Sequence, residues 1–269
     1  MNKIKICRQL EKTVRRIVVD NGSKIISAGT GVIVSSDGTM LTANHVIADQ
    51  DVGLFNGKIL VSGLGDNKSE LEYEPVVHNL KLDVKQGDFL KPINLDLAIL
   101  RPSIPVKKIE YVKLQKKLSQ DGSEIIMAGF PDDLELPFGF VDYFNLSNPD
   151  MVSVKEAMDK RFKYFFRQLM FKSGMVGHAP EITFNDLDVS GLKIRNLTKI
   201  NTCGAIYWLD NHLTYGGSGG PVVNKNGELV GILCKKAMTN EKDKLPGGIE
   251  KLPSGTGMAL AHQLISWAL

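Results

Sequence analysis

Short apolar runs separated by turn residues dominate the hydrophobic pattern of the chain. Stretches of four to eight residues rich in Val, Ile and Leu recur along it, bounded by Gly, Asn or Asp, which is typical of β-strands. The runs that predict strands most clearly are VRRIVVD (14–20), TGVIVSS (30–36), LDLAILRP (95–102), SEIIMAGFP (123–131), PVVNKNGELVGILC (221–234) and TGMALA (256–261).

Two of the turns between these runs carry a strong hairpin signal. SSDGTM (35–40) and NKNGEL (224–229) place Asp-Gly and Asn-Gly between apolar segments, and these dipeptides favour the tight turns of β-hairpins. Hairpins spread along the whole chain favour an antiparallel all-β architecture, either a sandwich or a barrel.

One segment departs from this pattern and predicts a helix over residues 147–171. It begins with Asn148 and Pro149, a capping residue and a first-turn proline. Apolar residues then repeat at spacings of three and four, which places them on one helix face. We also expect helices in the first dozen residues and at 262–269. The apolar face of the long helix comprises Val154, Met158, Phe162, Phe165 and Leu169.

Composition narrows the class of protein. A net charge of +3 without a dense basic tract argues against nucleic acid as a partner. The three cysteines, Cys7, Cys203 and Cys234, form neither a disulfide framework nor a zinc-binding spacing, and no two histidines share ligand spacing. No secretory signal or membrane-spanning stretch is visible. We therefore expect a cytoplasmic protein without a transmembrane segment, a metal or a cofactor.

The stretch TYGGSGGPVVN (214–224) surrounds Ser218 with four glycines. Glycine is costly to order, and it is favoured where the backbone needs positive φ or a close approach. A serine nucleophile needs a base, and it needs backbone N–H groups aimed at the oxyanion formed during acyl transfer. Taken alone, the stretch fits either a nucleophile loop or a plain glycine-rich turn.

Two further stretches favour the nucleophile loop. GTGVIVSSDGTMLTANHVI (29–47) predicts a hairpin that leads to His45, and NLDLAIL (94–100) places Asp96 at the head of an apolar strand. A carboxylate that enters such a strand is costly to bury unless it is hydrogen-bonded, and an imidazole N–H would satisfy it. The order His45, Asp96, Ser218 is that of the chymotrypsin-type triad.

These three stretches resemble the trypsin/chymotrypsin-like serine proteases, most closely the HtrA/Deg-type branch. The matching motifs are T-x-x-H-V, D-L-A-I-L and G-x-S-G-G-P, the last followed by GELVGIL (227–233). The resemblance implies an all-β fold of two perpendicular antiparallel Greek-key barrels in a single protease domain. The first barrel is expected over 12–110 and the second over 120–262, with the active site in the cleft between them.

By the same resemblance, the chain is a serine endopeptidase that acts on protein or peptide substrates through an acyl-enzyme. His45 is then the general base, Asp96 orients it, and Ser218 is the nucleophile. The backbone N–H groups of Gly216 and Ser218 form the oxyanion hole. We expect no PDZ module in this chain.

Gly217 departs from the family pattern. Secreted trypsins usually carry an aspartate at this position and Deg-type enzymes an asparagine, whereas here there is no side chain at all. The loop around Ser218 therefore gains freedom, which raises the question of what holds its oxyanion hole in shape.

Residues 136–199 match the family weakly and are expected to form an insertion in the second barrel. In the simplest interpretation, the predicted helix packs its apolar face on that barrel. The alternatives are a lid over the active site, a helix at a membrane surface, or a docking site for a regulatory partner through residues 147–172.

Motif position also predicts a substrate pocket among 212–216, 234–237 and 257–259. No aspartate falls at its base, so a preference for Lys or Arg is not supported, although Asp210 lies near in sequence. Cys234 is expected behind Asp96. The candidate lining residues are His212, Tyr215, Cys234, Lys235, Gly257 and Ala259.

Two rival interpretations remain. Gly216-x-Ser218-x-Gly220 also matches the nucleophile elbow of α/β-hydrolases, with Asp243 and His262 as partners, but Pro221 disfavours the helix that this fold needs. The second rival is a protease fold that has lost catalysis and serves as a binding module.

Overall fold

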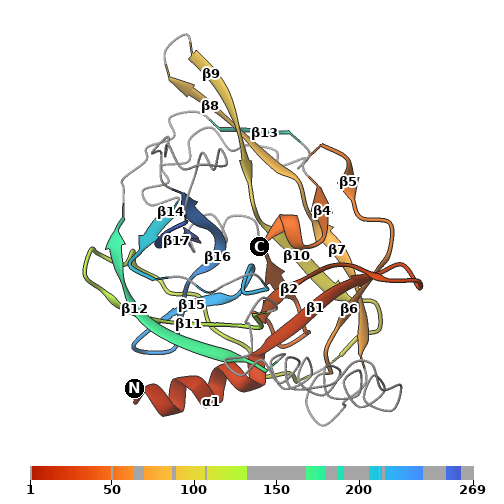
Figure 1. Cartoon of the computed structure of the whole chain (residues 1–269), viewed down its shortest axis with the longest axis horizontal. Coiled ribbons are helices and arrows are strands. Elements are labelled where there is room, and N and C mark those ends of the chain that lie inside the picture. The colour runs from red at the N-terminus through yellow and green to blue at the C-terminus, as the bar shows by residue number, and fades with distance from the viewer. Residues whose placement is uncertain are drawn as a thin grey trace, which may run out of the picture.

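Antiparallel sheet makes up most of the computed structural model of the chain (Figure 1). The structure describes residues 2–49, 51–63, 70–86, 89–106, 108–131, 168–179, 187–190, 206–211, 213, 216–238 and 253–261.

Two closed barrels of antiparallel strands form the body of the molecule. This confirms the predicted all-β, chymotrypsin-like fold class and rules out the α/β-hydrolase interpretation. The first barrel has the strand order β1-β2-β3-β10-β7-β6. Its strands are β1 (Val14–Asp20), β2 (Ile25–Ile33), β3 (Met40–Thr42), β6 (Lys58–Val61), β7 (Leu71–Val77) and β10 (Ala98–Pro102).

The second barrel has the order β11-β12-β14-β17-β16-β15. Both predicted hairpin turns are present, with Gly38 and Gly227 at positive φ of 86° and 77°. The strands are β11 (Glu124–Gly129), β12 (Met170–His178), β14 (Ile206–Leu209), β15 (Pro221–Asn224), β16 (Leu229–Met238) and β17 (Pro253–Ala261).

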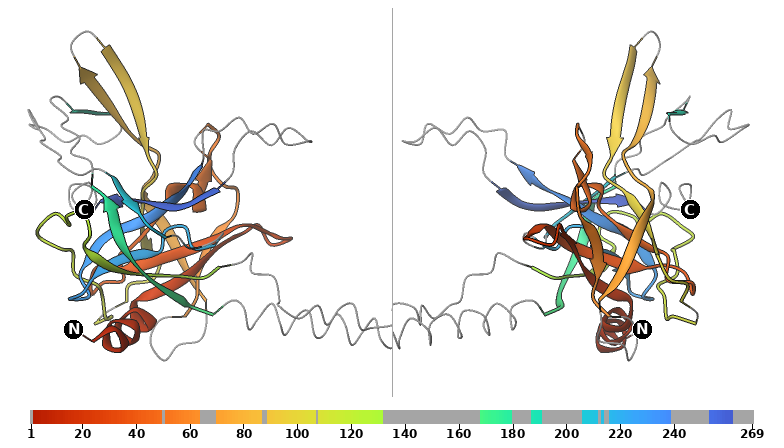
Figure 2. Two further views of the ribbon diagram at one scale, coloured as in Figure 1. Left: turned by 60° about the vertical axis from the view of Figure 1, so that its left-hand side comes forward. Right: turned by 90° about the vertical axis from the view of Figure 1, so that its right-hand side faces the viewer.

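A long hairpin projects from the first barrel between β7 and β10 (Figures 1 and 2). Its strands are β8 (Leu80–Gln86) and β9 (Phe89–Leu95), and β13 (Leu187–Ser190) pairs with β8. A second, short hairpin consists of β4 (Ala48–Asp49) and β5 (Gly53–Leu54). The long hairpin matters for the site because β9 ends one residue before Asp96.

Helix α1 (Lys3–Thr13) confirms the helix expected in the first dozen residues. The Asn2 side chain caps it by accepting a hydrogen bond from Ile4 N–H. Ile6 and Leu10 are fully buried in an apolar cluster that also contains Val32 of the first barrel and Ile126 of the second. The helix therefore closes the core at the joint between the two barrels.

The predicted helix over 147–171 ends differently from the expectation. Met170 and Phe171 lie in β12, where they pair with Gly129 and Ala128 of β11. These residues form backbone hydrogen bonds with the edge of β11. This pairing overrides the helical spacing of their side chains, on which the prediction rested. β12 is thus an integral barrel strand inside the range expected to be an insertion. Gln168 and Leu169 are not helical either, and residues 147–167, like the helix expected at 262–269, lie outside the described residues.

Among the described residues, no helix has the length and apolar character needed to cross a membrane.

Removing the apolar contact of α1 tests its place in the core. Leu10→Ala is expected to lower the free energy of unfolding by about 2–5 kcal/mol, because it leaves a cavity where two barrels and a helix meet. Ile4→Ala is the matched control on the exposed face, where the side chain is 62% accessible, and is expected to change it by less than about 0.5 kcal/mol. Equal effects in chemical denaturation would contradict this assignment of the core.

Candidate active site

His45 lies in a single turn of 3-10 helix, η1 (Asn44–Val46), directly after β3. The preceding Asp-Gly turn is closed by Val34 N–H donating to Thr39 O at 2.9 Å, and the Asp37 carboxylate accepts from Thr39 N–H at 3.0 Å. The hairpin thus delivers the chain to His45 in a fixed direction.

Asp96 lies in the short connection between β9 and β10. The three residues after it, Leu97, Ala98 and Ile99, are buried apolar side chains that draw this strand into the core. Ala98 pairs with Thr42 of β3. Because β3 and β10 are neighbours in the same barrel, the ends of the two strands bring residues 45 and 96 together.

The Asp96 carboxylate accepts two hydrogen bonds from His45. Its Oδ1 accepts from the backbone N–H at 2.9 Å, and its Oδ2 lies 2.7 Å from Nδ1 of the ring. The Asp96 side chain is only 7% exposed, whereas that of His45 is 43% exposed. An ionised carboxylate can only accept, so Nδ1 carries the proton in the neutral imidazole and Nε2 is left as the basic nitrogen.

A reciprocal pair of amides supports this arrangement. Asn44 Nδ2 donates to Asn79 Oδ1 at 2.7 Å, and Asn79 N–H donates to Asn44 Oδ1 at 2.7 Å. Asn44 is buried, and Asn79 has a φ of 50°, in the left-handed region that asparagine tolerates. The pair ties the residue before His45 to the base of the long hairpin. Neither asparagine was among the site residues predicted from the sequence.

The Ser218 loop lies against the segment that leads to His45. A Cβ on Gly219, which has a φ of 82°, would lie 2.8 Å from Ala43 N and closer still to Thr42 Oγ1. On its other side, a Cβ on Gly29 would lie 2.5 Å from Val46 Cγ2 and 3.1 Å from Ser218 O. The loop from the second barrel therefore packs against the residues that directly precede η1.

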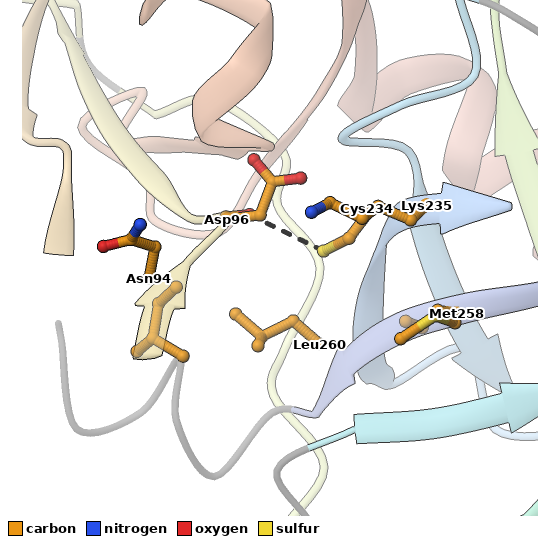
Figure 3. Close-up of a pocket in the computed structure, with 8 residues that line it drawn as sticks. Asn94, Asp96, Cys234, Lys235, Met258 and Leu260 are labelled. Carbon is orange, nitrogen blue, oxygen red and sulfur yellow. Dashed lines mark hydrogen bonds between the residues drawn. The ribbon is translucent and has the colours of Figure 1, made fainter. Parts of the chain in front are cut away.

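A cavity of about 110 Å³ lies between the end of β9 and strands β16 and β17 of the second barrel, and its lining is mainly apolar. Figure 3 shows Asp96, Cys234, Met258 and Leu260 around it, with a dashed line for the 3.5 Å hydrogen bond from Cys234 Sγ to the backbone oxygen of Asp96. The lining residues are Asn94, Leu95, Asp96, Cys234, Lys235, Met258, Ala259 and Leu260.

The structure brings three of the predicted pocket residues to this cavity, namely Cys234, Lys235 and Ala259. Gly257 is not among the lining residues, and His212 and Tyr215 lie outside the described residues. Met258 also lines the cavity and lies within the predicted range 257–259. Leu95 lies outside the predicted ranges, because a strand pattern predicts its burial but no cavity.

Asp210, the acidic residue nearest in sequence to the predicted pocket base, is engaged elsewhere. Its Oδ1 accepts a hydrogen bond from the backbone N–H of Met175 on β12 at 2.8 Å. This carboxylate therefore supports the barrel sheet.

The Cys234 thiol is held in its protonated form. Burial raises its pKa, and the negative charge of Asp96 raises it further. The side chain is thus a weak donor to Asp96 O, and at neutral pH it has little thiolate character.

A comparison with protein-family models matches residues 29–232 to the trypsin-like peptidase domain. The chain belongs to the trypsin-like peptidase family. The matched range contains His45, Asp96 and Ser218. A comparison with curated proteins found no match.

Solved structures share the trypsin-like fold at low sequence identity. A serine endoprotease from Yersinia pestis is 18% identical with a TM-score of 0.56, over 99% of this chain and 65% of that one. The Rv3671c protease from M. tuberculosis in its active form is 16% identical with a TM-score of 0.54, over 97% and 81%. The inactive form of Rv3671c protease is 15% identical with a TM-score of 0.53, over 98% and 90%.

The tautomer of His45 tests the geometry of the trypsin-like site directly. In Asp96→Asn, the amide oxygen is expected to keep the backbone N–H of His45 and to turn its NH₂ group toward Nδ1. Nδ1 must then accept, so the ring proton moves to Nε2, which ¹⁵N NMR of the imidazole measures.

Asp121→Asn is the matched control for this substitution. His178 and Asp121 form a similar pair at 3.3 Å, but both side chains are about 60% exposed, so water can replace the lost acceptor. We expect no comparable tautomer change at His178. An unchanged His45 tautomer in Asp96→Asn would contradict the assignment of the Nδ1 proton.

Proposed function

We propose that this trypsin-like domain is a serine endopeptidase that uses His45, Asp96 and Ser218 as its triad. The observation that carries the proposal is the buried Asp96 carboxylate, which accepts both the backbone and the ring N–H of His45 while the His45 side chain is 43% exposed. Family membership supports the same conclusion, since the match spans all three residues.

In the proposed mechanism, His45 Nε2 removes the proton of the Ser218 hydroxyl as the oxygen attacks the scissile carbonyl. Asp96 holds the ring and stabilises the imidazolium that forms. His45 then donates this proton to the leaving amine, which frees the first product. Water attacks the resulting acyl-enzyme by the same route in reverse and regenerates Ser218.

The N–H groups of Gly216 and Ser218 are the proposed donors to the oxyanion. The carbonyl of Gly217 accepts from Gly220 N–H at 3.0 Å. Because N–H and C=O point in opposite directions across a trans peptide, this bond turns Ser218 N–H away from Gly220. Such fixed donors stabilise charge as it develops in the transition state.

The cavity beside Asp96 is the proposed site for an apolar side chain of the substrate. Leu95, Met258 and Leu260 give it an apolar wall, and burying a side chain there would contribute free energy in proportion to the apolar area covered. We therefore propose protein or peptide substrates with an apolar residue near the cleaved bond.

The alternative function is a catalytically silent binding module with the same fold. Cytoplasmic location and regulation through residues 147–172 also stay predictions from the sequence.

Ser218→Ala tests the endopeptidase directly. Wild type is expected to cleave members of a peptide library and to react with a fluorophosphonate probe at Ser218. The variant is expected to lose at least about 10⁴-fold in kcat/KM, because it removes the nucleophile. Ser103→Ala, at an exposed serine of the first barrel, is the matched control and is expected to retain activity.

Two outcomes would count against the proposal. Cleavage that persists in Ser218→Ala would show that another group or a contaminant performs it. Wild type that neither cleaves nor reacts with the probe, although folded, would favour the silent binding module.

Met258→Trp tests the substrate pocket. The larger side chain is expected to fill the cavity and to lower kcat/KM for peptides with a large apolar residue by about tenfold or more, relative to the same peptides with alanine there. Met175→Trp is the control, since Met175 is exposed on β12 of the same barrel. An unchanged ratio between the two peptide sets would remove this cavity from the substrate site.

A further inference from the structure

Thr30 connects the first barrel to the Ser218 loop by two hydrogen bonds. It lies in β2 and is fully buried. Its backbone N–H donates to Ser218 O at 2.9 Å. Its Oγ1 donates to Gly216 O at 2.7 Å and accepts from Phe130 N–H at 3.0 Å. One residue of the first barrel thus binds the second barrel at three points.

These bonds fix the two peptide groups on either side of the Gly217–Ser218 peptide. Gly216 O belongs to the peptide between residues 216 and 217, and Ser218 O belongs to the one between 218 and 219. The peptide between them is held by Gly220 N–H. The N–H of Gly216 is separated from the first of these planes only by the backbone torsions of Gly216, whose φ is 84°.

Around Gly217 the loop has no side chain of its own with which to hold this shape. Gly217 has no side chain, and its Cα packs against Gly129, on which a Cβ would lie 3.0 Å away. Consecutive glycines otherwise leave the backbone many conformations of similar free energy. A buried hydroxyl that bonds a loop carbonyl selects among them at low cost, because its own strand is already ordered.

Thr30 is well suited to transmit a fixed position. It pairs with Arg16 of β1 in the middle of β2, and β-branched side chains have restricted χ1 rotamers in a strand. Thr42 Oγ1 donates to Thr30 O at 2.7 Å, so the backbone of Thr30 is held from β3 as well. The hydrogen bonds of Thr30 therefore fix the loop relative to β2 and β3, the two strands that lead to His45.

We propose that Thr30 is a positioning residue of the active site, which shapes the oxyanion-binding loop across the barrel interface in place of a side chain at Gly217. The proposal rests on the proposed function. Because the oxyanion exists only in the transition state, loss of the Thr30 hydroxyl acts on kcat more than on KM.

Thr30→Val tests this, because it keeps the shape of the side chain and removes the hydroxyl. We expect kcat to fall about 10- to 100-fold with KM nearly unchanged, a smaller loss than removal of an oxyanion donor itself. Thr30→Ser restores the hydroxyl and is expected to recover most of kcat. Thr13→Val is the matched control: Thr13 is fully buried and its Oγ1 donates to Gln9 O at 3.0 Å, but in α1.

Hydrogen exchange gives a readout that does not depend on turnover. In Thr30→Val, the amides of residues 216–220 are expected to exchange faster while those of β2 and β11 keep their protection, and Thr13→Val is expected to leave the loop unchanged. If Thr30→Val does not fold, Thr30→Cys replaces it, since a thiol is a weaker hydrogen-bond donor than a hydroxyl.

The outcomes separate the two proposals. An active wild type whose kcat survives Thr30→Val would overturn the role of Thr30 and leave the endopeptidase intact. A folded wild type without Ser218-dependent cleavage would overturn the endopeptidase. In that case the exchange experiment still decides on Thr30, because unchanged exchange at 216–220 would overturn its positioning role.

Discussion

The buried Asp96 carboxylate is the constraint on which the rest of the site depends. A carboxylate in this position is tolerable only with hydrogen bonds to both oxygens, and His45 supplies them from its backbone and its ring. The pairing of Ala98 with Thr42 sets the distance between the two residues. A slip of one residue in the β3–β10 register would separate them and would also turn the apolar side chains of β10 away from the core.

The second barrel contacts the segment before His45 through backbone atoms of the Ser218 loop. The Ser218 loop approaches so closely that a Cβ on Gly219 would strike Ala43 N and Thr42 Oγ1, and one on Gly220 would strike Ala128 O. The glycines are thus required by packing, in addition to their role in the proposed oxyanion site. Since a side chain at Gly219 would force the barrels apart, stability of the interface and geometry of the site depend on the same close contact.

The site residues predicted from the sequence are the ones that have a local signature. His45, Asp96 and the Ser218 loop each lie in a short motif whose chemistry limits its meaning. Thr30 and Asn79 have no such motif, because their partners are distant in sequence and become visible only when the barrels are assembled. The end of the helix predicted over 147–171 was wrong for a related reason, since pairing with β11 overrides the local apolar spacing at Met170.

The long β8–β9 hairpin lies directly beside the His45–Asp96 pair in the sequence but does not disturb it. It begins after Asn79, which is bonded to Asn44, and it ends at Leu95, next to Asp96. Both ends are therefore fixed by the residues that build the His45–Asp96 pair, and a loop with fixed ends adds little closure entropy as it lengthens. The geometry of the pair depends on these end contacts, so the hairpin between them can project from the barrel without altering the distance from His45 to Asp96.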